Sequence, residues 1–141
     1  MTRQELVLAA LSPANGATHT PVQVQKLFFL IDANIGALVD GPHFNFEPYH
    51  YGPFDQEVYR ELTELSNKGY IDIERGKWKS YRLTVEGQKK GDELFSSLDE
   101  KAADYIGKIS HFVRSLSFTQ LVASIYRAYP KMRERSVFQG Q

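Results

Sequence analysis

The side chains best suited to chemistry lie in one stretch, residues 43–55. Three polar groups surround His50 in the sequence: His43, Glu47 and Asp55. A histidine beside carboxylates is typical of a general base or a metal ligand. However, no HExxH motif occurs, histidines are not paired at helical spacing, and the chain has no cysteine. We therefore expect no catalytic residue, metal or cofactor, and interpret His50 as a hydrogen-bonded structural group.

A second chemical pattern is the basic stretch RGKWKSYR, residues 75–82. It holds four cations and no acid: Arg75, Lys77, Lys79 and Arg82. Cations interleaved with aromatic rings can meet phosphates while the rings stack on bases. Lysine and arginine are equally common on a solvated hairpin, where they protect an exposed strand edge. Both interpretations stay open, and we expect Trp78 and Tyr81 to pack at least partly on the core.

The elements that must position these residues are mainly helical. Capping-box spacings begin at Thr2, Thr20 and Ser117 and predict three helix starts. The second helix is expected over 21–38, the third from Pro53 or Phe54 to Gly69, the fourth over about 85–97, the fifth over 98–116, and the sixth from 117 until Pro130. The runs YIDIER and WKSYRL predict a β-hairpin over 70–83, here called the wing.

This order of elements predicts the fold class. Helix, helix, short strand, helix and hairpin is the order of a winged helix-turn-helix. We expect a mainly α fold with a small β-hairpin: one winged-helix-like domain with added C-terminal helices over 1–130, and a polar C-terminal tail over 131–141. The tail is interpreted as a frayed end, although Val137 and Phe138 have the character to dock on a neighbour.

Composition narrows the function classes. Seventeen basic and seventeen acidic residues give a formal net charge of zero, so no global charge favours nucleic acid. No apolar run approaches the roughly 20 residues that cross a bilayer, and the N-terminus MTRQELV lacks a signal-peptide pattern. We expect a cytoplasmic protein that does not bind membranes.

The aromatic stretch FEPYHYGPF, residues 46–54, is interpreted mainly as a structural joint. Tyr51-Gly52-Pro53 is expected to set the turn into the third helix, with Phe54 packing on Val58. Tyr49 and His50 are the members expected to face a partner.

Two helical segments bear on the kind of partner. In the third helix, from Asp55 to Lys68, four acids outnumber two bases, which disfavours a role in reading DNA. Four apolar side chains cluster where the fifth helix meets the sixth: Phe112, Leu116, Phe118 and Leu121. Their exposure would favour a partner protein or a homodimer, whereas burial against the first helix is the alternative.

Several motifs carry a family resemblance over about residues 20–130: KLFFLID, YHYGPFDQEVYREL, GYIDIE, YRLTVEG and SIYRAYP. This combination resembles the SocA-like (Panacea) antitoxin domains and the related YwgA-type bacterial proteins. The shared features are Lys26-Leu27, Tyr51-Gly52-Pro53, and Leu83-Thr84 with Gly87. The resemblance implies a small non-enzymatic module, of which some members neutralise a toxin or deliver one to a protease.

We rank three hypotheses. The first is a non-catalytic, antitoxin-like regulatory or protein-interaction module whose partner is a toxin or regulator, with Tyr49, His50, Tyr51 and Phe118 as partner-binding residues. The second is a DNA-binding transcriptional regulator that uses the wing through Arg75, Lys77, Lys79 and Arg82. The third is an enzyme that uses His50 with Glu47 or Asp55.

Overall fold

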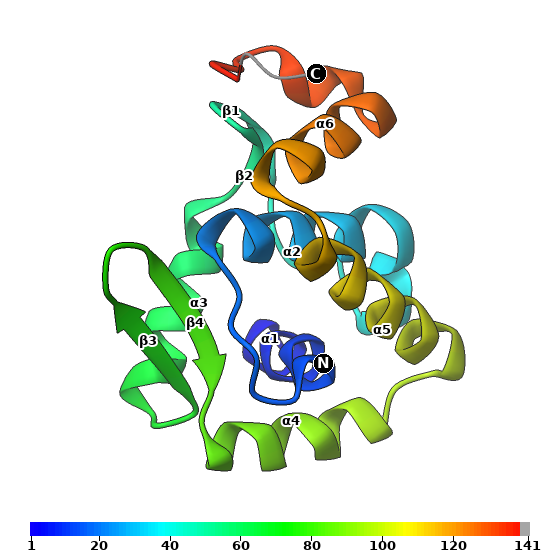
Figure 1. The fold of residues 1–141 in the computed structure, drawn as a ribbon. Coiled ribbons are helices and arrows are strands. Elements are labelled where there is room, and N and C mark those ends of the chain that lie inside the picture. Colours follow the sequence, from blue (N-terminus) through cyan, green and yellow to red (C-terminus); the bar gives the residue numbers. More distant parts are fainter. Residues whose placement is uncertain (139–141) are drawn as a thin grey trace.

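Helix α2 (Pro21–Ile35) lies at the centre of the fold, with the other helices arranged around it (Figure 1). The computed structural model describes residues 1–138. Over these residues the chain is mainly helical and contains two small antiparallel two-stranded sheets, which confirms the coarse fold expectation. Thr20 caps α2 in a capping box with Gln23, as the spacing predicted.

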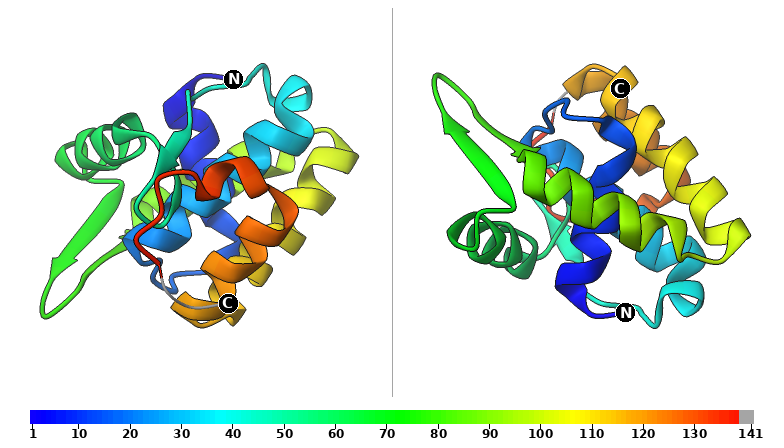
Figure 2. Two further views of the ribbon diagram at one scale, coloured as in Figure 1. Left: turned by 90° about the horizontal axis from the view of Figure 1, so that it is seen from above. Right: turned by 90° about the horizontal axis from the view of Figure 1, so that it is seen from below.

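Helices α1 (Arg3–Leu11) and α4 (Val85–Ser96) pack closely against each other. The right view of Figure 2, from below, shows α4 crossing α1. Two glycines of α4 allow close backbone approaches, Gly91 to α1 and Gly87 to Tyr70. A Cβ atom on Gly91 would lie 2.6 Å from the Leu8 carbonyl oxygen, and one on Gly87 would lie 1.9 Å from that of Tyr70. The bare backbone at Gly91 therefore lets α4 approach α1 closely, whereas that at Gly87 lets α4 approach Tyr70.

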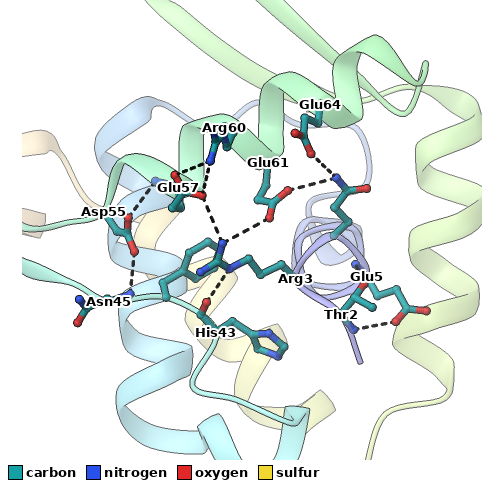
Figure 3. Close-up of polar contacts among 12 residues, drawn as sticks. Thr2, Arg3, Glu5, His43, Asn45, Asp55, Glu57, Arg60, Glu61 and Glu64 are labelled. Atoms are coloured by element: carbon teal, nitrogen blue, oxygen red, sulfur yellow. Dashed lines mark hydrogen bonds and ion pairs between the residues drawn. The ribbon is translucent and has the colours of Figure 1, made fainter.

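Helix α3 (Gln56–Asn67) is fixed to α1 by polar contacts (Figure 3). The Arg3 guanidinium donates to the His43 carbonyl oxygen at 2.7 Å and lies 3.4 Å from a Glu57 carboxylate oxygen. The Gln4 amide donates to Glu64 at 2.8 Å and to Glu61 at 3.2 Å. The acidic side of α3 thus faces α1 rather than an open groove.

The aromatic stretch forms a hairpin, so that its last residues, Pro53 and Phe54, lie in a strand and not at the predicted start of the third helix. Strand β1 (Glu47–Tyr49) pairs antiparallel with β2 (Gly52–Phe54). Pro53 lies in β2, and the helix begins only at Gln56 because Asp55 caps it by accepting from the Glu57 amide at 2.9 Å. Phe54 lies in β2 and so is not a helical neighbour of Val58; its ring meets those of Tyr49 and Tyr59.

The wing has the predicted form. Strand β3 (Ile71–Arg75) pairs antiparallel with β4 (Lys79–Leu83). His19 adds a single bridge to Tyr81, with backbone hydrogen bonds of 2.8 and 2.9 Å in both directions. This bridge ties the chain that enters α2 to the wing.

Helices α5 (Glu100–Ser115) and α6 (Phe118–Ala128) complete the helical layer, followed by a short 3-10 helix, η3 (Pro130–Arg133). The next residues return to the β1–β2 hairpin, where the Val137 amide donates to the His50 carbonyl oxygen at 3.0 Å. Phe138 contacts Phe118 and Tyr126. The expected frayed tail is therefore wrong for residues 131–138, because aromatic packing and backbone hydrogen bonds hold them; residues 139–141 lie outside the described residues.

By length and composition, the helical stretch Pro21–Val39 would suffice to cross a membrane. In this fold its α2 part lies inside the core, with four side chains fully buried: Val24, Leu27, Phe28 and Ile31. Packing against the surrounding helices accounts for the apolar character of the stretch.

Candidate protein-interaction site

An open apolar groove of about 530 Å³ lies where the N-terminus of α2, the β1–β2 turn, the wing tip and the α5–α6 corner meet. Its lining is almost entirely apolar or aromatic: Thr20, Pro21, Val22, Gln23, Tyr51, Trp78, Leu116, Phe118 and Leu121. We call this set the groove. No acidic residue lines it, so its chemistry is that of a surface for apolar and aromatic groups.

Two helix caps set the walls of the groove. The Thr20 hydroxyl accepts from the Gln23 amide at 3.2 Å, and the Ser117 hydroxyl accepts from the Gln120 amide at 3.1 Å. In both boxes the backbone amide of the cap residue donates in turn to the glutamine side-chain oxygen. The caps fix the directions in which α2 and α6 begin, and thereby place Phe118 at the groove.

The aromatic groups at the groove are only partly buried. Tyr51 is 43% exposed and Phe118 is 45% exposed, and their rings meet edge to face with centroids 5.1 Å apart. The structure therefore brings together two of the four predicted partner-binding residues. Of the corner cluster, Leu121 is buried while Phe112 remains exposed, so the cluster is divided between core and surface.

Trp78 does not pack on the core as predicted. Its side chain is 76% exposed at the wing tip, whereas Tyr81 is buried. The reason is that β4 begins only at Lys79, so Trp78 lies in the connection, outside the strand alternation that turns Tyr81 inward. A large exposed indole at the edge of an apolar groove is a feature of binding surfaces.

The predicted basic residues of the wing separate into two groups. Arg82 lies against acids of the paired strand, 3.4 Å from Asp72 and 3.3 Å from Glu74. Lys77 lies at the tip, its ammonium 5.8 Å from the Trp78 ring centroid. Arg75 and Lys79 are cross-strand neighbours and both are exposed. The wing therefore presents Arg75, Lys77 and Lys79 to solvent, with Arg82 paired with acids beside them.

The polar residues around His50 do not converge. The His43 ring nitrogen Nε2 lies 2.6 Å from the Val39 carbonyl oxygen, and the Asp55 carboxylate accepts from the Asn45 and Glu57 amides. The His50 ring stacks on Tyr49 with centroids 4.2 Å apart. Within residues 1–138, no group of three or more histidines and carboxylates is arranged to hold a metal ion. Among the described residues, no hydrogen bond or ion pair joins the His50 ring to Glu47 or Asp55.

Lys26 is the most unusual polar residue, and sequence reasoning treated it only as part of a motif. Its side chain is 3% exposed, and no hydrogen bond or ion pair to its amine is found within residues 1–138. Burial lowers the pKa of the Lys26 amine to about 7. The signal available in the sequence was a lysine amid the apolar run VQKLFFLI, where a charged residue of a central helix must be buried.

Lys26 lines a small cavity of about 140 Å³ that is otherwise formed largely by the β1–β2 hairpin. Its lining is Val22, Gln25, Lys26, Tyr49, His50, Tyr51, Gly52, Pro53, Phe54 and Tyr59, and we call it the Lys26 pocket. It includes Tyr49 and His50, the other two predicted partner-binding residues. Val22 and Tyr51 line both the Lys26 pocket and the groove, so the two hollows are neighbours.

Comparison of the chain with protein-family models, with curated proteins and with solved structures gives no match. The resemblance to the SocA-like and YwgA-type proteins therefore stays a prediction from the motifs.

Proposed function

We propose that this chain is a non-catalytic, antitoxin-like protein-interaction module that binds an apolar segment of a partner protein in the groove. The observation that carries the proposal is the apolar groove itself, with Tyr51, Trp78 and Phe118 exposed along it. Exposed aromatic side chains are the groups that most often dominate binding energy at protein interfaces. The toxin or regulator class of partner comes from the family resemblance of the motifs.

The scaffold in this proposal is a winged helix with helices added at its C-terminal end. The order of α1, α2, α3, β3 and β4 supports it, and so does the single His19–Tyr81 bridge, which ties the segment before α2 to the wing. The acidic α3, whose carboxylates contact Arg3 and Gln4, is poorly suited to the major groove of DNA. This scaffold therefore serves better for protein contact than for reading bases.

Nucleic-acid binding through the wing is the second candidate. Its supporting observation is the exposed tip, where Lys77 lies beside Trp78 and Arg75 and Lys79 stand nearby. A regulator of this kind would hold phosphates with the lysines and stack a base on the indole.

Photocrosslinking in extract of the source cells tests the first candidate. A photoreactive phenylalanine analogue in place of Trp78 is expected to capture a protein, and the same analogue at Val85, exposed on α4 away from the groove, is the matched control. The captured protein is then purified, and its affinity is measured for Phe118→Asp and Val85→Asp. We expect Phe118→Asp to weaken binding at least tenfold, about the effect of losing a hot spot. Equal affinity of both variants would reject the groove as the binding surface.

A further inference from the structure

We propose that the Lys26 pocket is a carboxylate-binding subsite of the groove, and that it takes an aspartate or glutamate side chain of the segment bound there. This inference rests on the proposed function, because the partner's segment carries the carboxylate. It adds a charge requirement to a groove that is otherwise apolar.

The first step is the state of the amine. Lys26 is nine-tenths or more buried, and the side chain of its neighbour in the sequence, Gln25, is already hydrogen-bonded elsewhere. The Gln25 amide donates to the Asp55 carbonyl oxygen at 3.0 Å and accepts from the Asp55 amide at 3.0 Å. Within residues 1–138 no hydrogen bond or ion pair reaches the amine, so its buried ammonium form is disfavoured, and a carboxylate that reached it would stabilise that form.

The second step is access for a ligand atom. Gly52 has φ +107°, and a Cβ atom there would lie 3.4 Å from the Lys26 amine and 3.5 Å from the Tyr126 ring. The glycine thus brings the hairpin backbone beside the amine without filling the space. The pocket volume of about 140 Å³ exceeds the share of one water molecule in liquid, roughly 30 Å³, several times, which is room for a carboxymethyl group.

The third step is continuity with the groove. Val22 and Lys26 are four residues apart on α2 and so lie on one face of the helix. Val22 and Tyr51 border both hollows. A segment lying in the groove therefore passes the entrance of the Lys26 pocket, and one of its side chains can enter.

The fourth step is the choice of anion. The ionisable groups that line the pocket with Lys26 are Tyr49, His50, Tyr51 and Tyr59. Lys26 supplies the only amine among the lining residues, and its single positive charge when protonated matches a singly charged carboxylate. A doubly charged phosphate would keep an uncompensated charge in a largely buried site. The depressed pKa of the amine agrees with this, since a bound carboxylate restores the protonated form.

NMR titration of the ¹⁵N-labelled full chain tests the subsite. The probe is glutamate blocked at both ends, N-acetyl-glutamate N-methylamide, and the matched control is the glutamine analogue, which differs only in lacking the charge. We expect saturable shifts of the Tyr51 and Gly52 amides with the glutamate probe, none with the glutamine probe, and loss of the shifts in Lys26→Met. Equal shifts with both probes, or undiminished binding by Lys26→Met, would overturn the subsite.

Two further arms complete the test. Acetate at constant ionic strength is expected to bind more weakly than the glutamate probe; tighter binding would assign the pocket to a free small carboxylate and overturn the role of the partner's side chain. Lys26→Gln, which retains a polar end, checks that lost shifts do not reflect misfolding of the methionine variant. Because the probe carries no apolar segment, its result is independent of Phe118→Asp, so the subsite and the groove can fail separately.

Discussion

The rings of Tyr51, in the β1–β2 turn, and Phe118, the first residue of α6, meet edge to face with centroids 5.1 Å apart and planes at 75°. This contact joins the hairpin to the C-terminal helices and forms one wall of the groove. An aromatic pair of this geometry adds about 0.5–1.5 kcal/mol beyond area burial. Since both rings remain nearly half exposed, their larger contribution is expected in binding rather than in folding.

Close packing of α4 on α1 gives the first prediction. Gly91→Ala places a Cβ atom 2.6 Å from the Leu8 carbonyl oxygen, so the helices must separate. We expect a loss of about 1–3 kcal/mol in the free energy of unfolding, as for other overpacked sites. Chemical denaturation measures it.

The matched control is Gly107→Ala on α5, where a Cβ atom would meet nothing within 4 Å. Alanine in the interior of a helix is favoured over glycine by roughly 0.5–1 kcal/mol, so this variant is expected to gain stability. A Gly91→Ala protein as stable as the Gly107→Ala protein would show that the α1–α4 contact is not tight.

Buried Lys26 gives the second prediction. Its pKa is about 7 in the folded chain against an ordinary value of 10.5, so the unfolded chain binds more protons between these pH values. The wild type therefore loses up to about 1.4 kcal/mol of stability per pH unit as the pH falls from 10.5 to 7. Lys26→Met removes this term, and we expect the variant to be the more stable protein at pH 7, with an advantage that shrinks towards pH 10. Urea denaturation at several pH values measures the difference; a constant difference across that range would mean that the amine titrates normally.

His19 gives the third prediction, which concerns stability at acidic pH. Burial, with a smaller effect of the nearby Arg114, lowers the pKa of His19 from 6.5 to about 4. In the unfolded chain His19 is protonated below about pH 6.5, whereas in the folded chain it is protonated only below about pH 4. Stability should therefore fall as the pH drops from 6.5 to 4, by up to about 1.4 kcal/mol per unit. We expect His19→Gln to have a smaller slope over this range in urea denaturation, whatever its stability at pH 7; an unchanged slope would contradict a neutral buried imidazole.

Much of the fold follows from local sequence signals. The capping boxes at Thr2, Thr20 and Ser117 all form as their spacings predicted, and the wing pairs in the expected place. These signals are reliable because their partners lie three residues away or across a short turn. The start of α3 was misjudged because Asp55 competes with Pro53 as the start signal, and the hairpin pairing of Pro53 depends on the more distant Pro48.

The site was less accessible to sequence reasoning. Tyr51 and Phe118 were both predicted to bind a partner, and the structure brings their rings together, but this contact depends on how α6 returns over the hairpin. The exposure of Trp78 and the docking of residues 136–138 also depend on tertiary contacts. The Lys26 pocket was missed because it forms only where α2, the β1–β2 hairpin and α3 meet, and no pattern along the chain shows that these segments leave space beside the Lys26 amine.

The wing gives the fourth prediction. In fluorescence anisotropy with a labelled random duplex, binding at low salt is expected to depend on the exposed Lys77 and Lys79 and not on Arg82, whose charge lies against Asp72 and Glu74. We expect no measurable binding at about 0.15 M salt, where a few phosphate contacts are largely screened. Tight binding at that salt, lost in the Lys77→Ala/Lys79→Ala double variant, would place the nucleic-acid candidate first.

The most direct test of the groove is a selection of displayed random peptides on the purified chain, followed by affinity measurements on Phe118→Asp and Val85→Asp. Trp78 is the only tryptophan of the chain, so its fluorescence reports directly whether a selected peptide lies in the groove. The account predicts peptides that combine apolar residues with an aspartate or glutamate, bind with a change in Trp78 emission, and lose at least about tenfold in affinity with Phe118→Asp alone. Selected peptides that bind both variants equally and leave the Trp78 emission unchanged would contradict it.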